Sequence, residues 1–249
     1  MNLYQHFRSD EHPFIDRISE WIQTVSERDQ QKRTDFLDPR QAYILSSIAA
    51  GEPDIVWELD GGDANAERKR AVIAPHYDVI EREDYGLAVV SFTSADMRFS
   101  KITHGDVLGA LLGLGIKREK LGDIYLHNEY CHCVVAEEIA PFIHLHLHQV
   151  HRVQVTTELI AIESLHALTA EYAELDFTVA SLRLDGILSE AARISRSKIM
   201  APIRSGACKV NWKVEQNPAT ELGEGDVISL KGFGRYRILQ IEGQTRKGR

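Results

Sequence analysis

The chain has 249 residues, of which 43% are hydrophobic and 27% charged, a balance typical of a folded globular protein with room for two or three small domains. The three cysteines, Cys131, Cys133 and Cys208, are too few for a disulfide framework. The sequence shows neither an apolar run of membrane-spanning length nor a signal-peptide pattern. We therefore expect a cytoplasmic protein without a membrane partner. The net charge of −8 argues against nucleic-acid binding by the chain as a whole, though not by one part of it.

The first 85 residues predict a small α/β domain. Apolar residues recur at helical spacing near its start, at Phe14, Ile15, Ile18, Trp21, Ile22 and Val25. Asp38 followed by Pro39 is typical of a helix start, and Gly51 of its end. Two strands, at residues 54–59 and 71–74, form a hairpin-like pair. We find no catalytic pattern here and expect an interaction surface.

Residues 86–157 predict a second domain of mixed helices and strands. We expect, in order, a strand at 87–93, a helix at 105–114, strands at 124–127 and 131–135, a helix at 136–146 and a strand at 150–156. The order βαββαβ is that of the ferredoxin-like fold, which RRM domains also use. An RRM reads RNA with aromatic side chains on its central strands, where this chain offers only Phe92. We therefore predict the fold without the RRM-type binding surface.

The basic loop after the first central helix has two interpretations, and the segment after the central region is predicted to be a linker. Lys117, Arg118 and Lys120 follow the first central helix. They are read either as a solvated loop or as a second contact to RNA or the ribosome. Residues 158–174 are expected to form a linking helix and residues 175–180 a strand, so that 158–180 connects the two flanking domains.

The last part of the chain, residues 181–249, is basic although the whole is acidic. It holds 13 Lys and Arg against 7 Asp and Glu, a net charge of +6, which leaves −14 for the remainder. Apolar spacing over 184–191 predicts a short helix, followed by a second helix with Ser195 as N-cap and Gly206 just after its end. Strands follow at residues 207–210, 213–214 and 227–230, with a turn at 211–212. This charge separation favours a basic binding module attached to an acidic body.

The second helix of this module begins with two cations, Arg196 and Lys198, where the helix dipole favours anions. Helix N–H groups with cations beside them form a site for phosphate. We expect Arg196 and Lys209 to be exposed, so that their loss weakens RNA binding and changes stability by only about half a kcal/mol. The candidate RNA-binding residues are Arg183, Arg193, Ser195, Arg196, Ser197, Lys198, Arg204, Lys209, Asn211 and Lys213. The alternative is a solvated basic face.

This module resembles the S4 RNA-binding domain in the segments RLDGIL, SRS, IRSGACKVNWK and GEGDVI. V-N-W-K, together with THGDVLGALLGLGIKREKLGDI upstream, is similar to the YlmH family in particular, over most of the chain. Two residues depart from the S4 pattern: Trp212 stands where glycine is usual, and Pro202, inside the second helix, is expected to kink it and displace Arg204. The resemblance implies a non-enzymatic, bacterial protein that contacts structured rRNA or tRNA on the large ribosomal subunit in ribosome-associated quality control.

Other functions are weighed against this reading. S4 domains are also attached to RNA-modifying enzymes, but the chain lacks a glycine-rich cofactor loop after a strand and the H-I-G-H and K-M-S-K-S elements of class I synthetases. The resemblance also implies a genetic link to cell division, so an interaction protein stays possible. Histidines and cysteines at residues 127–133 and 144–151 invite a metal site, but they lack ligand spacing, and we expect no metal, cofactor or small-molecule substrate.

Overall fold

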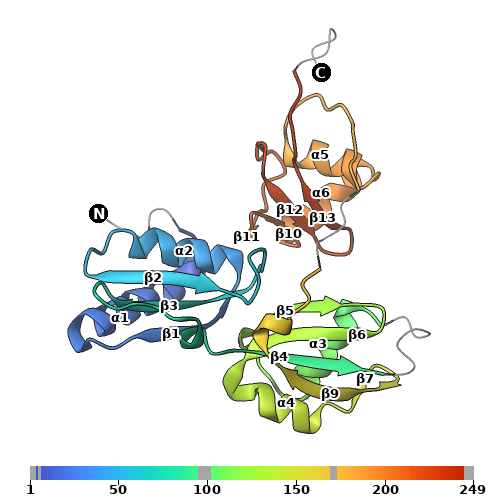
Figure 1. Cartoon of the computed structure of the whole chain (residues 1–249). Helices are drawn as coiled ribbons and strands as arrows, with labels where there is room; N and C mark the ends of the chain where they lie inside the picture. Colours follow the sequence, from blue (N-terminus) through green and yellow to red (C-terminus); the bar gives the residue numbers. More distant parts are fainter. Residues whose placement is uncertain (1–3, 5–6, 95–101, 169–172, 244–249) are drawn as a thin grey trace. The chain divides into compact units, whose positions relative to one another are not determined.

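The computed structural model describes Tyr4 and residues 7–94, 102–168 and 173–243. The chain divides into two compact units, Met1–Thr169 and Ala170–Arg249 (Figure 1). Both units combine helices with antiparallel sheets, which confirms the predicted α+β class. The predicted N-terminal and central domains lie together in the first unit, and the basic segment lies in the second. Among the described residues, no helix is long and apolar enough to cross a membrane.

The N-terminal part of the first unit is a three-stranded sheet with two helices on one face. Its elements are α1 (His12–Arg28), β1 (Lys32–Leu37), α2 (Pro39–Ala49), β2 (Ile55–Asp60) and β3 (Lys69–Pro75), in the sheet order β1-β3-β2. The helix start predicted at Asp38 is confirmed, because its carboxylate accepts the Gln41 N–H at 2.8 Å and Gln41 bonds back to the Asp38 N–H. Strand β1 was not predicted, since its charged sequence hides the buried side chains of Thr34 and Phe36.

The central part of the first unit has the predicted βαββαβ order. Its main elements are β4 (Leu87–Thr93), α3 (His104–Gly113), β5 (Leu121–Leu126), β6 (Tyr130–Ala136), α4 (Ala140–His146) and β9 (Thr156–Ile160). They form an antiparallel sheet in the order β5-β6-β4-β9. Alternate residues of β6, including Cys131 and Cys133, pack into the core on the helix side, together with Phe92 of β4. Phe92, the one ring that the predicted central strands offered, is therefore buried.

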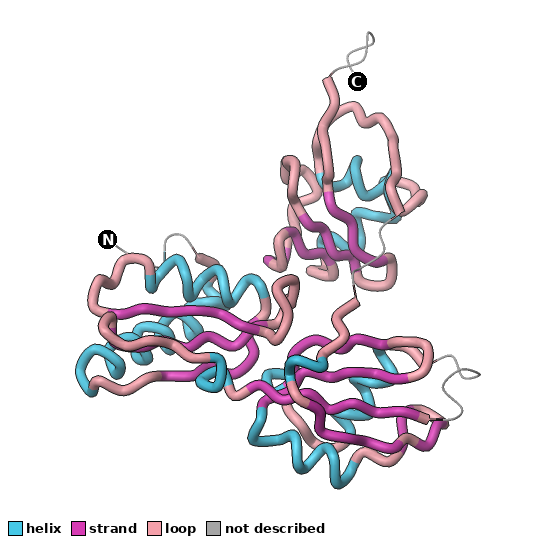
Figure 2. The backbone as a smooth tube through the Cα atoms, in the orientation of Figure 1, coloured by secondary structure: helices cyan, strands magenta, loops and turns pink. Residues whose placement is uncertain are grey.

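The structure corrects the prediction for residues 150–168 and 175–180, while residues 169–172, which the predicted linking helix also covers, lie outside the described part of the chain. In place of the strand predicted at 150–156, the chain forms a short hairpin of two strands, β7 (Gln149–Val150) and β8 (Val153–Gln154). The strand that joins the central four-stranded sheet is β9. β9 replaces the start of the predicted linking helix at 158–174, because backbone pairing with β4, for example Leu159 with Val90, overrides helix propensity. Residues 175–180, predicted as a strand, form a loop that pairs with none of the described strands (Figure 2).

The second unit is a four-stranded antiparallel sheet with two helices on one face. Its elements are α5 (Leu184–Ala191), α6 (Arg196–Arg204), β10 (Cys208–Val210), β11 (Lys213–Val214), β12 (Val227–Leu230) and β13 (Gly234–Arg237), in the sheet order β11-β10-β12-β13. Leu184, Leu188, Ile199 and Ile203 of the helices pack against Ile228 and the other inward residues of the sheet. Helix α6 continues through Pro202 to Arg204, and Gly206 has the expected left-handed backbone, with φ of 79°.

Candidate nucleic-acid interface

A buried carboxylate lies between the two helices of the second unit. Asp185, in the first turn of α5, is 3% exposed. Arg196, at the start of α6, donates from Nε and Nη2 to its two oxygens at 2.9 and 2.8 Å. Arg183 also donates to it, at 3.3 and 3.4 Å. The residues R-L-D and S-R-S, which carry the resemblance to S4 domains, therefore meet in one ion cluster.

This cluster changes the interpretation of Arg196. Its side chain is 54% exposed, so part of the guanidinium can still reach a phosphate. Burial alone would raise the pKa of Asp185, but hydrogen bonds from Arg196 and Arg183 outweigh it and hold that pKa below its ordinary value. Arg196 is exposed as predicted, but its pairing with a buried carboxylate leads us to expect a larger cost in stability on its loss than about half a kcal/mol. Its removal leaves a buried carboxylate with a weaker partner.

The start of α6 has the predicted position but not the predicted cap. Ser195 is the N-cap residue, yet its side chain accepts no hydrogen bond from the first turn. Its hydroxyl lies 3.2 Å from that of Ser197, and both serines are exposed. Lys198, in the same turn, is exposed as well. The two hydroxyls and this ammonium thus remain accessible to a ligand beside Arg196.

Asn211 has a structural role in the second unit. It opens the β10–β11 turn with φ of 48°, a conformation that asparagine tolerates. Its side-chain amide donates to Asp226 at 2.8 Å, and its Oδ1 accepts the Val227 N–H at 3.0 Å. The side chain is exposed but already bonded. Asn211 therefore fixes the turn beside the candidate residues.

Five of the ten candidate residues are exposed cations that form no ion pair within the described part of the chain: Arg193, Lys198, Arg204, Lys209 and Lys213. Lys209 lies on the sheet face opposite the helices, because its neighbours Cys208 and Val210 point into the core. Arg193 lies after α5, and Arg204 at the end of α6. The candidate residues are thus spread over a helix side and a sheet side.

Sequence reasoning missed two further cations on the sheet side. Arg235 and Arg237 on β13 are exposed, while Tyr236 between them packs against the core. The alternation in G-R-Y-R was the available signal, since a strand with one buried face shows this period. Arg235 pairs across the sheet with Ser229, which pairs in turn with Lys209. A basic row therefore crosses the sheet face opposite the helices.

The basic loop of the central part is largely used within the fold. Lys120 binds Asp35 at 2.6 Å and Glu138 at 2.8 Å, so it ties β1 to the central part. Arg118 donates to the Leu121 carbonyl at 2.7 Å, and burial lowers its pKa to about 10. Of the three cations, only Lys117 has a mostly exposed side chain, at 79%. Its Nζ lies 3.9 Å from Oε1 of Glu119. The alternative of an RNA contact here reduces to Lys117.

Four rings gather at one end of β5 and β6. His127 stacks on Tyr130 with centroids 4.3 Å apart, and the Tyr130 hydroxyl lies 2.7 Å from His166 Nδ1. The backbone N–H of His166 donates to Nδ1 of the buried His132 at 3.1 Å. Burial lowers the pKa of His132 to about 4. His132 is thus an uncharged acceptor near neutral pH. The cluster fastens the segment after β9 to the sheet and leaves Tyr130 partly accessible.

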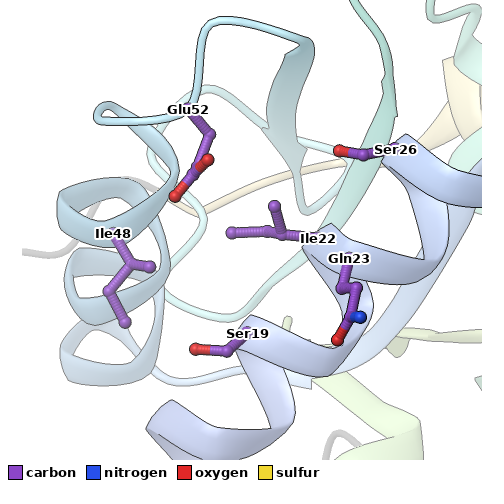
Figure 3. A pocket seen from close by; sticks show the side chains of 6 residues that line it. All are labelled: Ser19, Ile22, Gln23, Ser26, Ile48 and Glu52. Carbon is purple, nitrogen blue, oxygen red and sulfur yellow. The ribbon is translucent and has the colours of Figure 1, made fainter.

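The histidines and cysteines singled out in the sequence do not form a metal site in the part of the chain that the structure describes. No group of three or more His, Cys, Asp or Glu side chains in that part of the chain is placed to hold a metal ion. A shallow hollow of about 200 Å³ lies between α1 and α2 and is lined by Ser19, Ile22, Gln23, Ser26, Ile48 and Glu52 (Figure 3). The Ser19 hydroxyl donates to the Ile15 carbonyl. The lining of this hollow includes two serines and the carboxylate of Glu52, but no histidine.

Comparisons with known proteins point to RNA and to the ribosome. The family described as "Putative RNA-binding domain in YlmH" matches residues 81–164, which form the central part and not the basic unit. "Ribosome-associated protein quality control protein P2" of Bacillus subtilis (strain 168) is 40% identical over 246 residues, or 99% of this chain and 95% of that protein. The solved structure "Cell division protein ylmH from Streptococcus pneumoniae" is similar with a TM-score of 0.55 and 25% identity, over 64% of this chain and 96% of that chain.

Proposed function

Since the chain belongs to the YlmH family, we propose that it is a non-enzymatic RNA-binding protein of ribosome-associated quality control. It acts in the cytoplasm on the large ribosomal subunit, where it contacts structured ribosomal or transfer RNA. The second unit is its S4-type RNA-binding domain. The name of the B. subtilis relative supports the process, and the charge and geometry of the second unit support the mode of contact.

The observation that carries this proposal is the set of five exposed, unpaired cations of the second unit described above. RNA presents a row of phosphates, and each lysine or arginine that approaches one releases a counterion. A cation already held in an ion pair adds little to the binding free energy, because its charge is partly neutralised by its partner. An exposed, unpaired cation adds more. The remainder of the chain, with its net charge of −14, repels RNA.

A second candidate places the RNA contact on the central part. The family match over residues 81–164 favours it, because that family is described by its RNA binding. The ring cluster of His127, Tyr130 and His166 offers stacking surfaces there, and Lys117 and Arg152 are exposed cations. The prediction against this surface rested on Phe92 alone, whereas Tyr130 at the start of β6 is a further ring on the sheet. The two candidates differ in which charge reversals abolish binding.

Two alternatives receive less support. An RNA-modifying enzyme needs a cofactor site or a catalytic pair, and the sequence has neither a glycine-rich cofactor loop after a strand nor the synthetase elements that would indicate one. The S. pneumoniae relative is named a cell division protein, which suggests a role in that process. Nothing on the described surface identifies a division partner, so we keep RNA binding as the proposed function.

Replacing Lys209 by alanine tests the proposal in the second unit. We expect weaker binding to large-subunit ribosomal RNA, because one phosphate contact is lost. The log–log dependence of affinity on salt should become shallower by about one. Stability should change by less than about 0.5 kcal/mol, since Lys209 is exposed and unpaired. Titrations between about 50 and 200 mM salt, with a thermal melt of each variant, measure both quantities.

The control is Lys117→Ala, which removes an exposed lysine from the first unit. We expect this variant to bind like the wild type, with an unchanged salt slope. The proposal fails if the Lys209 variant keeps the wild-type affinity and slope. If only the Lys117 variant is impaired, the contact belongs to the central part.

A further inference from the structure

Trp212 occupies a backbone position that does not suit its side chain. Strands β10 and β11 are joined by a two-residue turn, with Val210 paired to Lys213 on either side. Asn211 and Trp212 have φ of 48° and 62°, both in the left-handed region. Such turns favour asparagine followed by glycine, because a bulky side chain is strained there. Folding alone therefore favours glycine at position 212, and the indole requires another explanation.

The indole lies on the sheet face away from the helices. Trp212 does not belong to the buried core of the second unit. The guanidinium carbon of Arg235 lies over the half-buried indole, 5.7 Å from its ring centroid, and Arg235 Nε donates to the Ser229 hydroxyl at 3.3 Å. Arg235, Ser229 and Lys209 are cross-strand neighbours in the basic row that crosses this face. The indole therefore lies beside that row.

We propose that this face binds an unpaired base of RNA, which stacks on the side of the Trp212 ring away from Arg235, while Lys209 and Arg235 contact the flanking phosphates. This inference rests on the proposed function and deepens it. An aromatic ring beside cations is the arrangement with which proteins hold single-stranded nucleic acid, because every base has a π-face and every nucleotide a phosphate. Structured RNA offers such bases in its loops and bulges.

The chemistry of the site separates the roles of its residues. Stacking on the indole is not a charge interaction, so it contributes affinity that salt does not screen. Lys209 and Arg235, which contact phosphates, supply the salt-dependent part. Arg235, held by Ser229 next to the ring, lies within reach of the phosphate that follows a stacked base. The site therefore prefers single-stranded RNA over a duplex, whose bases are already stacked on one another.

The full-length chain with Trp212→Gly tests this inference, because glycine suits the left-handed turn and its substitution removes the ring. The probes are a fluorescently labelled single-stranded RNA of about 12 nucleotides, within the range of about 4–16 that one such site covers, and its duplex. We expect a loss of about 5- to 150-fold for the single strand, the range that one stacked base contributes. The salt slope should stay unchanged, and the duplex affinity should change much less. Trp212→Phe should retain most of the affinity.

The outcomes are distinguishable. Trp212→Asn, which also suits the turn, serves as the second variant without an aromatic ring if the glycine variant folds poorly. Wild-type affinity for the single strand in both variants would overturn the inference, as would a salt slope reduced by about one, which indicates a phosphate contact instead. If the wild type binds neither probe nor ribosomal RNA, the proposed function itself fails. If Lys209→Ala weakens binding as expected and the Trp212 variants do not, only the inference fails.

Discussion

Leu188→Ala is expected to destabilise the second unit by about 2–5 kcal/mol, because it opens a cavity in a small core. Leu188 is fully buried and belongs to the cluster that joins α5 and α6 to the sheet. This core holds nine buried residues, so few neighbours can move in to fill the space. Loss of RNA affinity should follow, since the exposed cations are positioned by these elements.

Amide hydrogen exchange of the full chain measures this effect by unit. We expect faster exchange in α5, α6 and β12, while the first unit keeps the wild-type rates. Leu239→Ala, at a leucine that is 61% exposed, is the matched control and should change stability by less than about 0.5 kcal/mol. Equal protection in the two variants would show that Leu188 does not support the packing described here.

Asp185→Asn is expected to be the second large change, costing about 1–3 kcal/mol, because charge-assisted hydrogen bonds to a buried group are lost. Arg196 donates two of these bonds and Arg183 donates two longer ones. Asparagine keeps the shape of the side chain but presents one oxygen and no charge. The guanidinium groups of Arg183 and Arg196 are partly exposed, so water can replace some of the lost hydrogen bonds and limits the loss of stability.

The stabilisation by Asp185 should also depend on pH. Its pKa in the folded chain lies below its unfolded value, so the native state binds fewer protons near that value. The contribution is therefore complete above the unfolded pKa of about 3.9 and is lost as the pH falls through the folded pKa. Chemical denaturation at several pH values between about 7 and 3 should show wild type and Asp185→Asn converging at the acidic end.

Glu190→Gln in the same helix is the matched control for this experiment. Glu190 is exposed and its side chain makes no ion pair in the described part of the second unit. We expect a change of less than about 0.5 kcal/mol at every pH. If the two variants behave alike, the ion cluster does not contribute to stability.

Local signals predicted most helices and strands. Caps and turn residues such as Asp38, Gly206 and Asn211 fix backbone conformations that do not depend on distant residues. The failures occur where partners far apart in sequence decide the structure. Residues 156–160 form a strand because β4 has an edge to be paired, and residues 175–180 find no such edge. Neither fact can be seen in the segment itself.

The candidate site shows the same division. Its cations were found from charge counting and motif spacing, and they lie in one compact unit. The ion cluster was not foreseen, because Asp185 and Arg196 meet only after α5 and α6 have packed together. Loop cations Arg118 and Lys120 read as accessible in sequence, yet the fold uses them internally. Burial and pairing decide whether a basic residue is available to a ligand.

The most direct test of RNA binding by the second unit measures the affinity of two double charge reversals for purified large ribosomal subunits. Lys198→Glu with Lys209→Glu makes the second unit more negative by four charges, and Lys117→Glu with Arg152→Glu makes the same change on the central part. At physiological salt we expect the first variant to lose more than about tenfold in affinity, through lost phosphate contacts and new repulsion, and the second to bind nearly as the wild type does. Wild-type binding by the first variant, together with a large loss in the second, would contradict this assignment and move the RNA interface to the central part.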